Sequence, residues 1–399
     1  MIYLKTAISM RKNSLLAATF AWVSCPVFLS SMLLLSSCSS SGRQDSSSAT
    51  RDWTMSVLSD KSFLLDASTS QEINYLQVVN DDTMAFYNIP ENSIRYFRIS
   101  DGSEVGKTQL YEEGPHALRG VQGFCYVSPD TIWVYKSWEN DLVRVNARGE
   151  IAETRHVKDG LSSPLYGVFP FPMTDTPILH WRSRLILQGM DGRTDEGQLP
   201  GCTLLYDLAD STATCANGYP SVYGDPDKNA KNWGAFSFRQ VPYTMSPEEE
   251  LVLSYPASDS VRVFSLSTGQ TRSFSARYSK KTAACKPMTS PSEQADTEQY
   301  LDQYLYAGIV YDKYRHFYYR LVLLPLENYD LNDAKTQRKQ LAVMILDDSF
   351  RVVGEFELPK DRYKYRNVFV SREGLHINAL SEDDDYLRFV TLVPEKYEK

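Results

Sequence analysis

Hydrophobic and polar positions alternate along most of this chain. From Met55 to Val393, short β-branched and aromatic runs follow a period of two, and Gly, Asp, Asn and Ser interrupt them at short intervals. Sustained helical periodicity is almost absent from the same stretch. The 26 Tyr, 17 Phe and 6 Trp residues suit half-buried strands better than helices. The pattern therefore predicts an all-β chain.

A weak internal repeat predicts how the strands are grouped. Three segments align: NSIRYFRISDGSE from Asn92, DLVRVNARGE from Asp141 and DSVRVFSLSTGQ from Asp259. Each places a β-branched residue and an arginine (Arg95, Arg144, Arg262) ahead of a turn glycine (Gly102, Gly149, Gly269). A fourth hairpin, CTLLYDLADSTATC, lies between the second and third segments. Repeats of this length in an all-β chain are typical of propeller blades.

Six four-stranded blades can be assigned along the sequence. They cover residues 73–110, 121–157, 177–219, 236–277, 304–358 and 367–393. The last blade is one strand short, and the strand-like segment Met55 to Asp66 could pair there and close the ring. We therefore predict a six-bladed β-propeller. Seven blades is the alternative, if the long fifth blade is really two.

The N-terminus carries a pattern typical of an export signal. Basic residues (Lys5, Arg11, Lys12) precede a long apolar run that ends in Leu35-Ser36-Ser37-Cys38. This order predicts a lipoprotein signal peptide over residues 1–37, cleavage before Cys38 and a lipid on the Cys38 thiol. Residues 38–54 would then form a polar tether, and residues 55–399 the propeller domain. The alternative is an uncleaved membrane anchor over Ser14 to Leu35.

Charge narrows the choice of partners. The chain has a formal net charge of −8, and signal cleavage would remove three basic residues and no acidic one, giving −11. A surface of that sign repels phosphates, so we expect no nucleic-acid partner. The expected partners are a membrane, reached through the lipid on Cys38, and a glycan, peptide or protein ligand. We expect the outer membrane, with the periplasmic or surface face left open.

Four cysteines follow the lipid site. Cys202 and Cys215 flank a predicted hairpin with its turn near Leu208 and Ala209, so they could form a disulfide or be two small buried side chains. No Cys-x-x-Cys spacing supports zinc or redox chemistry, and the five histidines are scattered without metal-ligand spacing. The acidic run at residues 382–385 is more typical of a solvated hairpin tip than of a calcium loop. We expect no metal and no cofactor.

The segment from Tyr111 carries a family resemblance. Its marks are Gly114-Pro115 before a strand, a strand with Asp130, Ile132 and Val134, and a hairpin that ends at Gly149. In these features, and in its length and lipobox, the chain resembles a family of Bacteroidetes lipoproteins of unknown function with a TolB-like six-bladed propeller. The resemblance implies a fold and a location. It implies no established activity.

Long segments between the blades are candidate binding loops. Residues 158–176, 217–235 and 278–303 should share one face of the ring. Residues 219–233, YPSVYGDPDKNAKNW, mix aromatic and polar groups as a glycan- or peptide-binding surface would. In contrast, SPSEQADTEQ at residues 290–299 is more typical of a disordered insert.

The candidate ligand-binding residues lie in the loop 217–235, in the loop before the second blade and in one turn of that blade. They are Trp138, Glu139, Asn140, His116, Arg119, Tyr223 and Trp233. The alternative is that Trp138 covers a neighbouring blade and that the charged residues are simply solvated. No nucleophile elbow or phosphate loop is found. The sequence therefore favours a non-catalytic binding or scaffold propeller, with a propeller hydrolase or lyase, whose carboxylates meet at the channel mouth, as the alternative.

Overall fold

A computed structural model describes residues 51–160, 168–191, 201–224, 231–234 and 236–397. All of the described residues belong to one compact unit. The predicted signal peptide, Cys38 and most of the predicted tether lie outside the described residues.

Four small antiparallel sheets account for residues 76–275, and within each sheet most strands pair with the next strand in the sequence. The first contains β2 (Leu76–Asn80), β3 (Thr83–Asn88), β4 (Ser93–Arg98) and β5 (Glu104–Gln109). The second contains β6 (Val121–Ser128), β7 (Thr131–Lys136), β8 (Asp141–Val145) and β9 (Ile151–His156). The third contains β10 (Val168–Pro170), β11 (Leu179–Trp181), β12 (Arg184–Asp191), β13 (Gly201–Asp207) and β14 (Ala213–Asn217). The fourth contains β15 (Tyr243–Met245), β16 (Glu250–Ser254), β17 (Ser260–Ser265) and β18 (Thr271–Ser275).

The remaining strands form one eight-stranded sheet made of two meanders. One meander contains β19 (Leu305–Asp312), β20 (Phe317–Leu323), β21 (Leu341–Leu346) and β22 (Val352–Glu357). The other contains β23 (Tyr363–Val370), β24 (Leu375–Ala379), β25 (Tyr386–Lys396) and β1 (Trp53–Leu64). The two are joined only where Trp53 of β1 meets Gly354 of β22 in parallel register.

Strand β1 completes the sheet that contains the C-terminal strands. It pairs antiparallel with β25 from Trp53 opposite Lys396 to Leu64 opposite Tyr386. The sequence-based prediction that Met55 to Asp66 pairs with the last three strands is thus confirmed. The strand begins at Trp53, inside the segment predicted as the end of the tether. The first and last sheets also share a core, because the Phe63 ring packs edge-on against Phe97 and Phe389.

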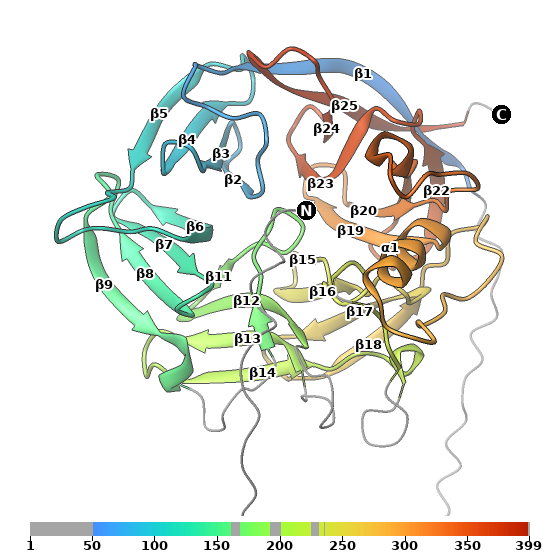
Figure 1. Cartoon of the computed structure of the whole chain (residues 1–399), viewed down its shortest axis with the longest axis horizontal. Coiled ribbons are helices and arrows are strands. Elements are labelled where there is room, and N and C mark those ends of the chain that lie inside the picture. Colours follow the sequence, from blue (N-terminus) through green and yellow to red (C-terminus); the bar gives the residue numbers. More distant parts are fainter. Residues whose placement is uncertain (1–50, 161–167, 192–200, 225–230, 235, 398–399) are drawn as a thin grey trace, which may run out of the picture. The chain divides into compact units, whose positions relative to one another are not determined.

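The sheets follow one another around a propeller-like ring (Figure 1). Innermost strands of successive sheets are in contact, as in β2 with β6, β6 with β11, β15 with β19 and β19 with β23. Strand β23 also contacts β2, which closes the circle. The three repeated segments occupy equivalent places, because Arg95, Arg144 and Arg262 all lie on the third strand of their sheets. The repeat was therefore correctly interpreted as a repeat of sheets.

Alternation in the sequence explains these strands only in part. The central strands are buried on both faces, as in β21, where all six residues are buried, and β7, where the middle four are. Outer strands such as β9 alternate between half-buried and exposed residues, which is the pattern of a sheet with one wet face. Sheet-to-sheet packing thus covers the continuous apolar runs.

One loop prediction was wrong. Residues Glu293–Asp302, predicted to lie largely in a disordered insert, form helix α1. The Ser292 side chain accepts a hydrogen bond from the Ala295 backbone N–H and so caps the helix. Gln299 and Leu301 are the buried residues of this helix, and its other residues are half-buried or exposed. Its polar composition concealed the helix in the sequence. Three short 3-10 helices span Val157–Gly160, Ser221–Tyr223 and Ala334–Gln337.

The four described cysteines are free thiols. The predicted hairpin exists as β13 and β14, but Leu204, and not Cys202, is the residue opposite Cys215. A register shift between Gly201 and Thr203 accompanies this offset. Instead, Cys202 is buried and donates to the Asn217 carbonyl oxygen at 2.9 Å. Of the two interpretations that the sequence left open, the structure shows no disulfide between these residues; Cys202 is a buried thiol and Cys215 is half-buried.

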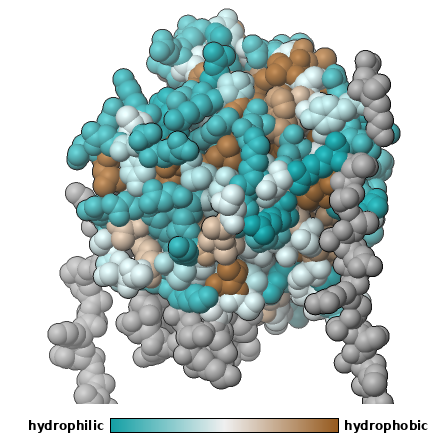
Figure 2. All heavy atoms as spheres, turned by 90° about the vertical axis from the view of Figure 1, so that its right-hand side faces the viewer, coloured by the Kyte–Doolittle hydropathy of each residue, from teal (hydrophilic) through white to brown (hydrophobic). Residues whose placement is uncertain are grey.

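The side of the molecule seen in Figure 2 is mainly hydrophilic, with hydrophobic residues in small separate groups. Among the described residues, no helix is both long and apolar enough to cross a membrane. The same residues contain no cluster of three His, Cys, Asp or Glu side chains that could hold a metal ion.

Candidate functional site

A short segment between β10 and β11 crosses the ring between non-adjacent sheets; we call residues 171–176 the plug segment. The Thr174 hydroxyl accepts from the Leu76 backbone N–H and donates to Asn367 Oδ1, both at 3.0 Å. The Asp175 carbonyl oxygen accepts from the Tyr243 N–H at 3.2 Å. Leu76, Tyr243 and Asn367 belong to the innermost strands of three different sheets. The plug segment therefore ties three parts of the ring together.

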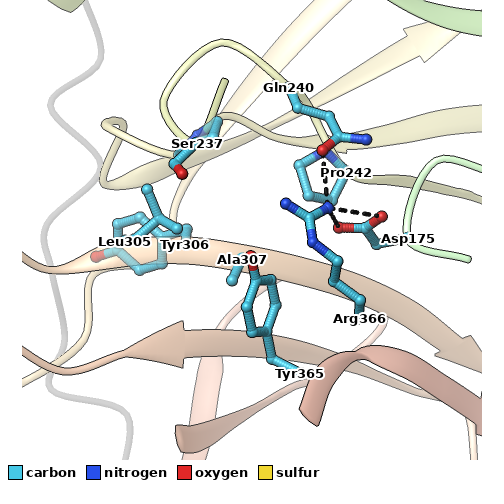
Figure 3. A pocket seen from close by; sticks show the side chains of 10 residues that line it. Asp175, Ser237, Gln240, Pro242, Leu305, Tyr306, Ala307, Tyr365 and Arg366 are labelled. Carbon is cyan, nitrogen blue, oxygen red and sulfur yellow. Dashed lines mark hydrogen bonds and ion pairs between the residues drawn. The ribbon is translucent and has the colours of Figure 1, made fainter. Parts of the chain in front are cut away.

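Beside the plug segment lies a small, partly open hollow with room for about one water molecule. Most of it is built from the starts of inner strands and from the segments just before them. The lining residues are Asp175, Ser237, Gln240, Pro242, Pro256, Leu305, Tyr306, Ala307, Tyr365 and Arg366 (Figure 3). The hollow thus lies on the face that collects the loops between sheets, which is where the sequence predicted ligand binding.

Arg366 is the central polar residue of this hollow. Its Nη1 atom donates to Gln240 Oε1 at 2.8 Å and to Asp175 Oδ2 at 3.1 Å. The guanidinium carbon lies 5.1 Å from the Phe236 ring centre and 5.0 Å from that of Tyr365, within the range of cation–π attraction. In Figure 3 the other terminal nitrogen points away from Asp175, into the hollow. Arg366 is therefore held in place through this nitrogen, and Tyr365 is a further hydrogen-bonding partner of its side chain.

Burial shapes the electrostatics of the site. It raises the pKa of the Asp175 carboxyl above its ordinary value, and the positive charge of Arg366 opposes this shift without cancelling it. Burial would lower the pKa of Arg366, but Tyr365 and Asp175 hold it above its ordinary value. The Asp175 side chain is only 6% exposed, whereas that of Arg366 is 22% exposed. The arginine is thus the charged group that a ligand can reach.

The predicted cluster around Trp138 lies elsewhere, at the β7–β8 turn and in the β5–β6 loop. Trp138 is 80% exposed, and Glu139 pairs with Lys136 at 2.8 Å. Asn140 has a left-handed backbone and its side chain accepts from the Tyr135 hydroxyl at 2.8 Å. His116 Nδ1 accepts from the Ile151 backbone N–H, and Arg119 pairs with Glu112 at 3.5 Å. Ligand binding by these residues stays a prediction, with Trp138 as its accessible aromatic group.

Tyr223 and Trp233, the other two predicted residues, are buried. They are 2% and 3% exposed, with ring centres 4.9 Å apart. The Tyr223 hydroxyl donates to the Phe238 carbonyl oxygen at 2.7 Å. Both side chains belong to the largest apolar cluster of the ring. Their role in binding stays a prediction that no exposed ring surface supports.

Sequence reasoning missed Arg366, Asp175 and Gln240. Two predicted loops end next to the hollow, since Asp175 lies in the loop 158–176 and Ser237 stands two residues after the end of the loop 217–235. A second signal was available in β23, whose sequence YKYRNVFV places charged residues in an innermost strand where apolar ones are expected. Charged residues in such a strand indicate a polar site at the centre of the ring.

The fold and this site define a propeller-like, mostly β protein with a plugged ring and a small polar hollow beside the plug. The chain belongs to the family described as Domain of unknown function (DUF4221), which matches residues 52–357. The resemblance inferred from the sequence is thereby confirmed at the level of a family of unknown function.

Solved structures of Bacteroides proteins share the fold. A DUF4221 protein from Bacteroides vulgatus has a TM-score of 0.75 and 21% sequence identity, and the match covers 87% of this chain and 100% of that one. A Bacteroides fragilis protein inferred to be exported has a TM-score of 0.50 and 10% identity over 88% of this chain and 97% of that one. No curated protein is significantly similar to this chain. These likenesses establish the fold.

Proposed function

We propose that this protein is a non-catalytic binding propeller of the cell envelope, which holds a glycan, peptide or protein partner at the face that carries the loops between its sheets. The observation behind the proposal is Arg366, which is fixed by Asp175 and Gln240 and directs its second terminal nitrogen into the hollow. A buried, preorganised donor beside apolar walls is a common feature of ligand sites.

The lining of the hollow favours binding over hydrolysis. Among the described residues that line it, Asp175 is the one carboxylate and there is no histidine. Hydrolases and lyases of the predicted alternative class need a second carboxylate or a histidine within reach of the same point. Asp175, moreover, is committed to Arg366.

Six blades is the count that we propose for the ring. Each of the two meanders in the eight-stranded sheet has four strands, and a single residue pair, Trp53 with Gly354, connects them. Counting these meanders separately and adding the four other sheets gives six. Strand β1, from the start of the domain, pairs with β25, from its end, and so closes the last blade. The edge of β25 that faces β1 is therefore hydrogen-bonded and not exposed.

Anchoring belongs to the same proposal. The lipobox before Cys38 would place a lipid at the mature N-terminus, and β1 begins 15 residues after Cys38, at Trp53. A tether of this length keeps the ring close to the membrane surface. The inferred export of the Bacteroides fragilis relative supports an envelope location.

A ligand screen tests the binding site. Envelope glycans and short peptides are screened against the purified protein by thermal shift, and the affinity of each ligand found is then measured for Arg366→Lys. This variant keeps a positive charge for Asp175 but loses the nitrogen that faces the hollow. We expect a loss of about tenfold or more in affinity, as for removal of one charge-assisted hydrogen bond.

Two controls define the outcome of the screen. Arg144→Lys changes an arginine that is also paired with a carboxylate, Glu153, but far along the ring in β8, and should leave affinity unchanged. Trp138→Ala tests the hairpin-tip site. If affinity falls for Trp138→Ala and not for Arg366→Lys, the site lies at the β7–β8 turn. If neither change matters for any ligand, the proposed binding face is wrong.

A further inference from the structure

The turns that follow the second strand of the first sheet and of the second sheet are built alike. In the β3–β4 turn, the Tyr87 hydroxyl donates a hydrogen bond to Asn92 Oδ1 at 2.7 Å. In the β7–β8 turn, the Tyr135 hydroxyl donates to Asn140 Oδ1 at 2.8 Å. Both asparagines have a left-handed backbone, with φ of 52° and 58°. Each turn is therefore closed by a side chain, and the residues at its tip are preorganised.

The loop between the first two sheets joins these tips into one surface. Asn92 Nδ2 donates to the Leu118 carbonyl oxygen at 2.8 Å, so the first tip contacts this loop. The loop ends at Val121, which lies opposite Lys136 at the base of the second tip. The tip surface, as we call it, consists of residues 88–92, 111–120 and 136–141.

Large apolar side chains of the tip surface are exposed. Trp138 is 80% exposed, Ile89 is 53% exposed and Tyr111 is 41% exposed. In the part of the chain that the structure describes, no other large hydrophobic side chain is as exposed as Trp138. Tryptophan and tyrosine contribute most to binding when a pocket on a protein partner encloses them. Rigid turns that hold such side chains in water thus indicate a surface for contact with another molecule.

The tip surface is acidic. It holds five acidic and two basic residues, a net charge of −3. The acidic residues are Glu91, Glu112, Glu113, Glu139 and Asp141, and the basic ones are Arg119 and Lys136. Arg119 pairs with Glu112 at 3.5 Å. Lys136 pairs with Glu139 at 2.8 Å. These two pairs leave a surplus of three carboxylates.

Neighbouring charges do not remove this surplus. Glu91 pairs with Lys107 at 2.5 Å and with Arg95 at 3.3 Å, and both cations lie outside the tip surface. Arg95 also pairs with Asp66 and Glu104, so this network adds two cations and two further carboxylates. A partner with lysine and arginine around its contact area would be attracted to such a surface.

We infer that the tip surface docks a protein partner whose contact area is basic and has an apolar recess for Trp138. The inference rests on the proposed function and specifies the class of partner. A glycan fits less well, because Ile89 offers no ring on which a sugar can stack. Nucleic acids and anionic lipids carry the same sign of charge as the tip surface and are repelled. A second copy of this chain is disfavoured for the same reason, since its overall charge is −8.

Photo-crosslinking in cells that normally make the protein identifies the partner. The photoreactive residue p-benzoylphenylalanine replaces Ser137, next to Trp138, and in a control it replaces Val105, an exposed residue of β5. We expect a protein that crosslinks from position 137 and not from position 105. It is identified by mass spectrometry and purified, and its affinity for the full chain is then measured, because capture alone does not establish binding.

Two sets of variants test the apolar and the charged part of the surface. Trp138→Ala and Ile89→Ser should weaken binding, the first at least about tenfold, whereas Val105→Ser should leave it unchanged. Glu113→Lys should weaken binding several-fold, and Asp130→Lys, in the turn at the opposite end of β7, should not. The affinity should also fall as salt is raised, because salt screens the charges.

Failure of this inference can be separated from failure of the proposed function. No crosslinked protein from position 137, equal crosslinking from both positions, or an affinity that ignores Trp138→Ala overturns it. An affinity that neither salt nor Glu113→Lys changes overturns the basic partner, and so does a crosslink to a second copy of the chain. If a ligand from the screen still loses affinity in Arg366→Lys, the proposed function stands without this inference. If no ligand or partner responds to Arg366→Lys or Trp138→Ala, both are wrong.

Discussion

Buried polar side chains in this ring are held by hydrogen bonds to neighbouring groups, and the kind of partner differs from one side chain to the next. Arg320 is surrounded by carbonyl oxygens, Arg366 by a carboxylate and an amide, and His376 by two hydroxyls. His376 is fully buried in β24, 2.7 Å from Ser371 Oγ and 3.1 Å from Thr391 Oγ1, and it stacks on Phe369. Its burial and these contacts make His376 a packed residue of the core.

His376 should make the protein sensitive to acid. Burial lowers its pKa from 6.5 to about 3, with smaller contributions from Lys61 and Arg315. Between these two values the unfolded state binds more protons than the folded state, so the free energy of unfolding falls as pH is lowered from 6.5 towards 3. We expect His376→Gln to reduce this pH dependence, by an amount on the order of 1 kcal/mol per pH unit at most.

Urea denaturation at pH 6.5 and pH 4.5 measures the effect. The control is His156→Gln, because His156 lies in the outer strand β9 with a side chain that is 54% exposed. An unchanged difference between the two pH values in His376→Gln would show that other groups account for the acid sensitivity.

At the scale of elements, the ring depends on contacts between parts of the chain that are distant in sequence. Strand β1 pairs with β25 across more than 300 residues, and the plug segment bonds to β2, β15 and β23. Helix α1 is fastened in a similar way, since Lys339 donates to the carbonyl oxygens of Tyr300 and Gln303 near its C-terminal end. These links account for elements that local sequence patterns did not show.

If β1 closes the ring, alanine substitutions at two adjacent residues of this strand should have very different effects on the free energy of unfolding. Phe63 is fully buried between the first and last sheets, whereas Leu64 is 60% exposed. Phe63→Ala should lower the free energy of unfolding by about 3–5 kcal/mol, because it leaves a cavity where the two sheets meet. Leu64→Ala should change it by about 0.5 kcal/mol or less. Equilibrium denaturation of both variants checks this, and similar values for the two would show that β1 does not close the ring in solution.

At the scale of the whole molecule, one ring surrounds a plugged centre, and its sheets are stabilised by their neighbours. The hollow exists only because inner strands and loops from the third, fourth, fifth and last groups of strands meet there. The lipoprotein signal predicted from the sequence would determine where such a ring works. It lies outside the described residues, so location and architecture can be tested separately.

The predicted lipid modification can be tested at the N-terminus of the mature protein. We expect membrane-extracted protein to begin at Cys38 and to carry the mass of a diacylglycerol on its thiol, as the small residues before Cys38 suit the signal peptidase. Mass spectrometry of the N-terminal peptide measures this. Cys38→Ala should release the protein from the membrane fraction, and a variant that stays membrane-bound would favour an uncleaved anchor.

The sequence determined the all-β class, the positions of most sheets and the strand that completes the last one. These follow from local alternation, from turn residues and from a repeat such as Arg95, Arg144 and Arg262, all of which act over a few residues. A resemblance to a Bacteroidetes family of unknown function could also be inferred from the chain alone, from the segment that begins at Tyr111.

Only the tertiary structure decided which side chains form the site. Trp233 and Trp138 look alike in sequence, but one is 3% and the other 80% exposed, because exposure depends on what the rest of the ring places above a loop. Asp175, Gln240 and Arg366 are separated by 65 and 126 residues, and no local pattern relates them. They meet because the plug segment and the inner strands converge on the ring centre, and such a meeting is a property of the folded chain.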